Sequence, residues 1–182
     1  MKKTLLLILS IIPIILQAQM IWTGIGVTNK QEKYKFYSGV EERVYIPLKQ
    51  KDFMVDMRFT STIWKVMPVA GLSVWNHVDN GELRPYYGID SKYFRLLMEH
   101  RLYNDKDPTS RLRARLSYKQ KICSWYYLLV SEELFWAKEF DHNRLILGMQ
   151  FKLKKLDFDL GYMSYHKDKN VNTLILKLNF NL

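Results

Sequence analysis

The sequence has a single cysteine, Cys123, so it cannot form an internal disulfide bond. Beyond its first eighteen residues it also lacks any apolar run approaching the roughly 20 residues of a membrane-spanning helix. A scaffold stapled by disulfides and a mature protein that spans a membrane by helices are therefore both excluded. Any membrane insertion of the mature chain has to use strands.

The sequence also lacks a recognisable catalytic or metal-binding constellation. Its histidines are scattered, at His77, His100, His142 and His166. Three of them fall in expected loops, no pair has metal-ligand spacing, and no Ser–His–acid set falls on one expected strand face. The neighbours Glu132 and Glu133 point to opposite faces of a strand and cannot share one site. We therefore expect no enzyme, no cofactor and no metal.

The first residues have the pattern of a secretory signal peptide. Lys2 and Lys3 form a charged region, residues 5–16 are mostly apolar, and Ala18 supplies a small residue for cleavage. We predict a signal peptide over 1–18 and a single mature domain over 19–182. Removal of the signal leaves 26 basic and 18 acidic residues, a net charge of +8. In an exported chain this basic balance favours anionic lipid rather than nucleic acid as a partner.

The rest of the chain is a series of segments of about ten residues whose side chains alternate between apolar and polar, separated by turn-like stretches. In the last segment Leu174, Leu176, Leu178 and Phe180 share one face, while Lys177 falls on the other. Such a segment is typical of the closing strand of an outer-membrane barrel. The expected segments are 20–28, 33–46, 52–63, 66–75, 83–90, 93–103, 111–118, 124–135, 143–152, 156–165 and 174–182.

This pattern predicts an all-β fold, an antiparallel up-and-down transmembrane β-barrel. Eleven segments are visible, whereas bacterial single-chain barrels have even strand numbers. We predict about ten strands from residue 33 onward, with twelve as the alternative, and leave the role of 20–28 open. Connections are expected to alternate between short periplasmic turns and longer outer loops.

Aromatic residues gather near the expected strand ends. Membrane barrels carry a ring of outward-facing aromatic side chains there, the interfacial girdle. In this sequence the residues are Trp22, Tyr45, Trp64, Trp75, Tyr103, Tyr118, Trp125, Trp136 and Tyr165.

Charged residues gather on the expected inward face. In a narrow barrel they are interpreted first as a salt-bridged filling, because buried charges must pair or be reached by water. Rings of such residues are alternatively able to select anions in a channel. The lumen-facing candidates are Glu41, Arg43, Asp56, Arg58, Arg95, Glu99, Arg101, Arg111, Arg113, Arg115, Arg144, Asp157, Asp159 and Lys177.

Several short motifs resemble an uncharacterised family of outer-membrane barrels, domain of unknown function 2490. They are Trp22 soon after the signal, Glu41-Glu42-Arg43, Arg84-Pro85-Tyr86, the run 129–135, Asn143-Arg144-Leu145 and Leu160-Gly161-Tyr162-Met163. The resemblance implies a barrel in the outer membrane with no established activity.

The sequence therefore predicts a Gram-negative outer-membrane barrel, narrow and filled by side chains, with a structural or surface-interaction role. Its expected partners are outer-membrane lipid, lipopolysaccharide and the barrel insertion machinery; the sequence does not indicate a specific ligand. Three alternatives stay open: a small channel for anions or small solutes, an envelope lipid-modifying enzyme, and a soluble periplasmic lipocalin-like binding protein.

Overall fold

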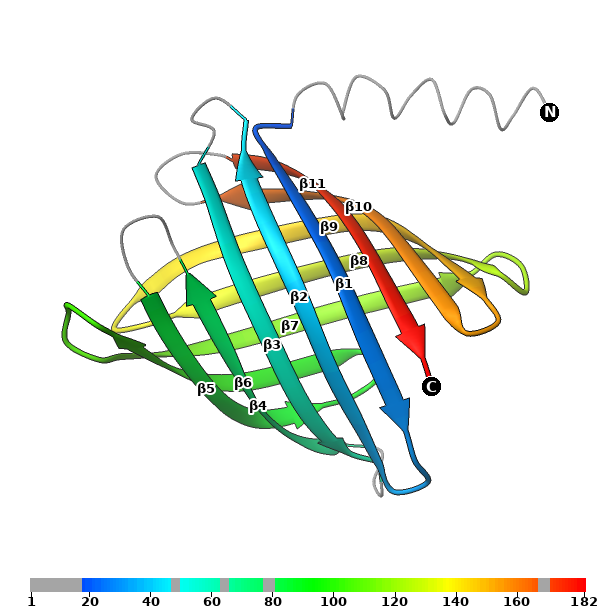
Figure 1. The fold of residues 1–182 in the computed structure, drawn as a ribbon, viewed down its shortest axis with the longest axis horizontal. Helices are drawn as coiled ribbons and strands as arrows, with labels where there is room; N and C mark the ends of the chain where they lie inside the picture. Colours follow the sequence, from blue (N-terminus) through cyan, green and yellow to red (C-terminus); the bar gives the residue numbers. More distant parts are fainter. Residues whose placement is uncertain (1–17, 47–49, 63–65, 77–80, 167–170) are drawn as a thin grey trace.

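A computed structural model describes residues 18–46, 50–62, 66–76, 81–166 and 171–182. The predicted signal peptide lies outside these residues except for Ala18. The described chain forms eleven strands that close into one barrel (Figure 1). They are β1 (Met20–Lys30), β2 (Tyr34–Tyr45), β3 (Gln50–Ser61), β4 (Met67–Asn76), β5 (Gly81–Asp90), β6 (Phe94–Tyr103), β7 (Thr109–Lys121), β8 (Tyr126–Trp136), β9 (Phe140–Leu153), β10 (Leu156–His166) and β11 (Val171–Asn181). The all-β barrel predicted from the sequence is confirmed.

The strand number is eleven rather than the ten predicted, because the amino-terminal segment is itself a strand, β1. In an up-and-down barrel with an odd number of strands the first and last strands run in the same direction. β1 and β11 accordingly pair in parallel, from Met20 opposite Thr173 to Thr28 opposite Asn181. Every other neighbouring pair is antiparallel. We call the β1–β11 pair the seam.

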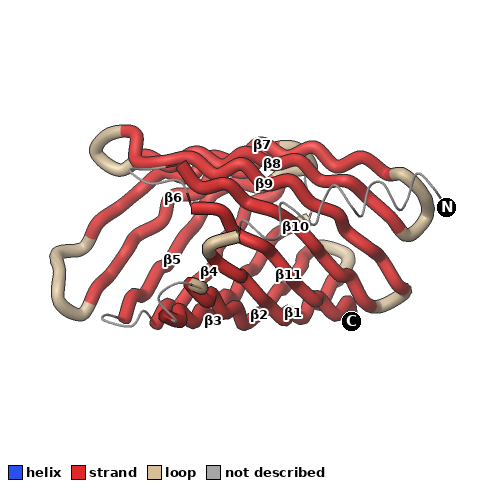
Figure 2. The backbone as a smooth tube through the Cα atoms, turned by 90° about the horizontal axis from the view of Figure 1, so that it is seen from above, coloured by secondary structure: helices blue, strands red, loops and turns tan. Residues whose placement is uncertain are grey.

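The strands are tilted, so that those of opposite walls cross in projection (Figure 1), and the walls enclose the lumen when the barrel is turned by 90° (Figure 2). We call end A the end with the connections 31–33, 91–93, 122–125 and 154–155, and end B the end with 104–108 and 137–139. These connections have two to four residues at end A, and five and three at end B. Among the described connections the observed difference in length between the two ends is therefore smaller than the sequence predicted.

Alternation along each strand sorts side chains between the lumen and the outside. In β9, Arg144 is buried in the lumen, whereas Leu145 and Leu147 face outward and stay exposed. In β11, Ile175 and Lys177 line the lumen, which puts Leu176 and Leu178 on the outer face. Among the described residues no helix is long and apolar enough to span a membrane.

Two positions in β5 shape the wall beside the lumen. Pro85 has no N–H to donate, and the pairing of β5 with β6 omits Arg84 and Pro85 between the pairs Leu83–Leu102 and Tyr86–Glu99. At Gly88, a Cβ atom would lie 2.0 Å from the backbone oxygen of Leu96. The close approach of β5 and β6 there requires glycine.

The lumen holds two small apolar clusters separated by charge. Near end B the buried residues Met20, Trp22, Met163 and Ile175 pack together. Near end A the cluster consists of Val69, Tyr86 and Leu97. Between them the inward positions are mainly charged, so the centre of this barrel is an ionic network rather than an apolar core.

Candidate functional site: a charged belt in the lumen

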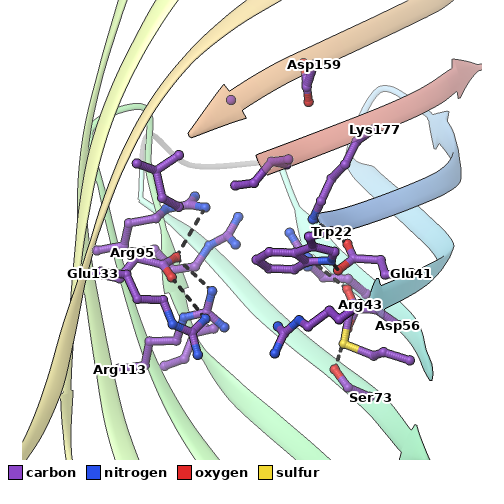
Figure 3. Close-up of a pocket in the computed structure, with 18 of the residues that line it drawn as sticks. Trp22, Glu41, Arg43, Asp56, Ser73, Arg95, Arg113, Glu133, Asp159 and Lys177 are labelled. Atoms are coloured by element: carbon purple, nitrogen blue, oxygen red, sulfur yellow. Dashed lines mark hydrogen bonds and ion pairs between the residues drawn. The ribbon is translucent and has the colours of Figure 1, made fainter. Parts of the chain in front are cut away.

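A cavity of about 350 Å³ lies in the lumen, and charged side chains dominate its lining (Figure 3). The basic lining residues are Arg43, Arg58, Arg84, Arg95, Arg111, Arg113, Arg115, Arg144 and Lys177. The acidic ones are Glu41, Asp56, Glu99, Glu133 and Asp159. Nine basic against five acidic residues leave the lining with an excess of positive charge.

Arg113 bridges two buried carboxylates across three strands. Its Nη1 donates to Glu99 on β6 over 3.0 Å, and its Nη2 donates to Glu133 on β8 over 2.8 Å. Arg111, two residues earlier on β7, donates from Nε to Glu99 over 2.6 Å. The strand register explains this: Glu99 is directly opposite Arg111, Glu133 is directly opposite Arg115, and Arg113 is the diagonal neighbour of both acids. The result is a continuous ion-pair chain along one wall.

On the facing side of the cavity, cations and indoles form a second chain. The guanidinium of Arg43 lies 4.2 Å from the ring centres of both Trp22 and Trp75. Lys177 approaches Trp22 at 3.9 Å, and Arg84 approaches Trp75 at 4.3 Å. Arg43 forms no ion pair with another described residue, and its buried Nε has no hydrogen-bond partner among them. Cation–π contacts therefore hold this arginine.

Carboxylates fix both ends of that chain. Glu41 accepts hydrogen bonds from the Trp22 indole N–H and from Lys177 Nζ, each over 2.7 Å. Figure 3 shows these three side chains together beside Arg43. At the other end, Glu82 accepts two hydrogen bonds of 2.5 Å from Arg84. The indoles are thus positioned from both sides.

A third group surrounds Asp56 on β3. Its carboxylate accepts hydrogen bonds from Ser73 Oγ over 2.7 Å, from Tyr86 Oη over 2.9 Å and from Arg58 Nη2 over 2.8 Å. Gly71 leaves room for the Tyr86 ring, because a Cβ atom there would lie 2.3 Å from its Cζ and Oη. The small residue and the phenol together allow a buried aspartate to be fully hydrogen-bonded.

Phe135 on β8 is completely buried at the meeting point of several cations. Arg111, Arg113 and Arg144 lie 4.7, 5.5 and 4.5 Å from its ring centre. The ring of His142 stacks on it at 4.1 Å. His142, which was expected in a loop, is a buried residue of β9, because that strand begins earlier than predicted.

The lumen-facing candidates named from the sequence are brought together with two exceptions. Twelve of the fourteen line the cavity: Glu41, Arg43, Asp56, Arg58, Arg95, Glu99, Arg111, Arg113, Arg115, Arg144, Asp159 and Lys177. Arg101 instead donates to Glu82 over 2.5 Å, and Asp157 is absent from the lining.

Some lumen residues were not predicted from the sequence. Trp22 and Trp75 were assigned to the interfacial girdle, but both are buried in the lumen. For Trp75 alternation offered a signal, because Trp75 follows Ser73, another residue of the cavity lining, by two positions. Glu82 was missed because β5 begins earlier than expected. Trp64 and His77 lie outside the described residues.

The expected opposition of Glu132 and Glu133 is observed. Glu133 is buried in the lumen and Glu132 is exposed.

The outer face holds two Ser–His contacts that the sequence analysis did not recognise. Ser164 Oγ lies 3.0 Å from Nε2 of His166, two residues along β10, and His100 Nδ1 lies 2.8 Å from Ser110 Oγ on the neighbouring strand. Each pairs a hydroxyl with a potential base. Within the described ranges no group of three or more His, Cys, Asp or Glu side chains is placed to hold a metal ion.

Comparison with known families locates a match in the second half of the barrel. The model of DUF2490, described as a protein of unknown function, matches residues 92–174. The resemblance noted in the sequence is thereby confirmed over that range, which covers β6 to β10 and reaches into β11. It includes the Glu99–Arg113–Glu133 bridge. A search of curated proteins finds no match.

Proposed function

We propose that this chain is exported and spans the outer membrane of a Gram-negative envelope, with a structural or surface-interaction role. One observation carries the proposal: large apolar side chains face outward while charged ones are buried inside. Leu116, Ile25 and Leu147 are 65%, 57% and 47% exposed on the outer face. A soluble protein rarely leaves so much apolar surface in water, whereas lipid accommodates it.

The lumen contacts support a filled barrel rather than an open pore. Arg113 and Glu133 lie along one wall, and Arg43 lies beside Trp22 on the facing side (Figure 3). Paired charges of this kind resist separation, because removing one partner leaves the other buried and uncompensated. We therefore expect the barrel to pass no steady current.

Membrane fractionation and gel mobility test the membrane proposal. The protein should sediment with outer membranes and, in detergent, migrate differently before and after boiling. A protein that is recovered soluble from the periplasm, with the same mobility boiled and unboiled, would favour the lipocalin-like alternative instead.

Planar-bilayer recording tests the filling. A steady, large, anion-selective current that Arg113→Gln abolishes would make the protein a channel, the alternative favoured by the excess of basic residues in the cavity lining.

The lipid-modifying enzyme remains a second candidate because of the outward pair Ser164 and His166. A serine hydroxyl next to a base can attack a lipid ester, with histidine taking its proton. Incubation of the folded barrel with phospholipid and lipopolysaccharide, followed by analysis of released fatty acid, tests this function. Release that persists in Ser164→Ala excludes that serine as the nucleophile, and absence of release with the wild type rejects the enzyme.

A further inference from the structure

Among the described residues the two ends of the barrel differ in charge. End A carries a ring of exposed lysines, which we call the lysine rim: Lys30, Lys33, Lys35, Lys92, Lys121, Lys152, Lys154 and Lys155. They belong to four connections and the adjoining strand ends. The only exposed acidic side chain among the described residues of this end is Glu32, and the carboxylate of Leu182 lies at the same end. At end B the described connections hold Asp105, Asp107 and Glu139 against Lys106 and Lys138, so acids there outnumber bases.

Hydration alone does not explain the lysine rim. The end of a membrane barrel needs polar groups, but carboxylates and ammonium groups meet that need equally well. Eight lysines beside one acidic side chain and one terminal carboxylate repel each other, and none of the eight forms an ion pair with another described residue. A surface of one sign without internal partners is expected to meet an external surface of the opposite sign.

Aromatic side chains at the same end of the barrel indicate the depth at which that partner lies. Tyr34 stacks on Phe59 at 5.6 Å, and Trp125 stacks on Phe151 at 6.1 Å. Tyr93 is 54% exposed. Exposed aromatic rings at a strand end favour the boundary between acyl chains and head groups. The lysine rim, which lies among them, is then at the level of the head groups.

We propose that the lysine rim binds the phosphate groups of lipopolysaccharide, and that end A therefore faces the outer leaflet. This orientation is the reverse of the one expected from its short connections alone. This inference rests on the proposed outer-membrane location. Lipopolysaccharide carries several phosphates on one molecule, so one lipid can engage lysines from more than one connection at once, and simultaneous contacts strengthen binding. A glycerophospholipid offers fewer phosphates to the same ring. Each lysine near an anionic lipid surface contributes about fivefold to binding.

Binding is measured on the folded barrel in non-ionic detergent, after boiled and unboiled gel mobilities show that it has folded. The test variant is Lys92→Gln, Lys121→Gln and Lys155→Gln combined. The matched control is Lys51→Gln, Lys106→Gln and Lys138→Gln, which removes the same charge at end B. Titration with lipopolysaccharide should give affinity at least about tenfold weaker for the rim variant and unchanged for the control.

Two results of that titration would overturn the proposal: equal affinity of the wild type and the rim variant, or equal binding of lipopolysaccharide and phosphatidylglycerol at the same phosphate concentration. A barrel that fails to show heat-modifiable mobility rejects the proposed function instead, so the two failures are distinguishable.

The native cysteine reports the orientation independently. Cys123 lies in the 122–125 connection of end A and is partly exposed. A membrane-impermeant maleimide should label it on intact cells. A reporter at end B, Ala137→Cys with Cys123→Ser, should be labelled only after the outer membrane is opened. The opposite labelling pattern would place the lysine rim in the periplasm and overturn the assignment.

Discussion

Replacement of Arg113 by glutamine should destabilise the barrel by about 3 kcal/mol. This value follows from the ion pairs that each carboxylate keeps after the substitution. Glu99 retains Arg111 at 2.6 Å, so its charge stays compensated. Glu133 keeps only Arg144 at 3.8 Å and Arg115 at 4.0 Å, and its side chain is 3% exposed. The loss therefore falls mainly on Glu133, at the lower end of the ~3–5 kcal/mol typical of a broken buried pair.

A double-mutant cycle in urea-dependent folding into phosphatidylcholine bilayers isolates this effect. Adding Glu133→Gln to Arg113→Gln removes the stranded charge. The double variant should therefore lose at least ~1 kcal/mol less stability than the sum of the losses of the two single variants. Arg43→Gln is the matched control, because this arginine is held by indoles and forms no ion pair with another described residue. Its loss should add to that of Glu133→Gln within ~0.5 kcal/mol. Strict additivity in both cycles, with Arg113→Gln as stable as wild type, would refute the filled lumen.

Three further changes test the wall of the barrel. Leu147→Arg, on the outer face at mid-strand, should cost ~2–4 kcal/mol in bilayers, whereas Gln150→Arg, on the lumen face, should be much milder; equal penalties would show that the faces are reversed. Gly88→Ala should lower the urea midpoint, since its Cβ would lie 2.0 Å from a backbone oxygen of β6; an unchanged midpoint contradicts the close approach. Cysteines at Thr23 and Leu176, which are register partners across the seam, should form a disulfide on oxidation when the native cysteine is replaced, and a pair shifted by two residues should not.

Strand positions were predictable from sequence because alternation is local. All eleven segments recognised at period two are strands, with boundaries displaced by a few residues. The same alternation predicted that Glu133 and Glu132 diverge, and it brought together most of the charged residues around the cavity. This prediction requires only the odd or even position of a residue along its strand, which we call its parity. Parity can be read directly from the sequence.

Partners across the lumen were not predictable in the same way. An aromatic residue near a strand end suits an interfacial girdle and a cation–π contact equally well, so Trp22 was placed outside although it contacts Arg43 inside. Parity resolves this ambiguity only where the strand boundary is known. Arg113 and its partner Glu99 lie in one hairpin, whereas the second contact of Arg113, to Glu133, depends on the register of the next strand.

The prediction of ten strands was wrong for a related reason. The seam joins the two most distant parts of the described chain. No local pattern tells β1 to pair with β11, and such contacts carry the largest loop-closure cost. The lumen network supplies long-range contacts at this place. Lys177 on β11 reaches across β1 to Glu41 on β2, and Glu41 also holds the Trp22 indole of β1. Thr28 on β1 donates to Asn179 on β11 over 3.1 Å. The charged belt therefore stabilises the closure of the barrel as well as filling its centre, and this gives a buried ionic network a structural role in a fold whose first and last strands must find each other.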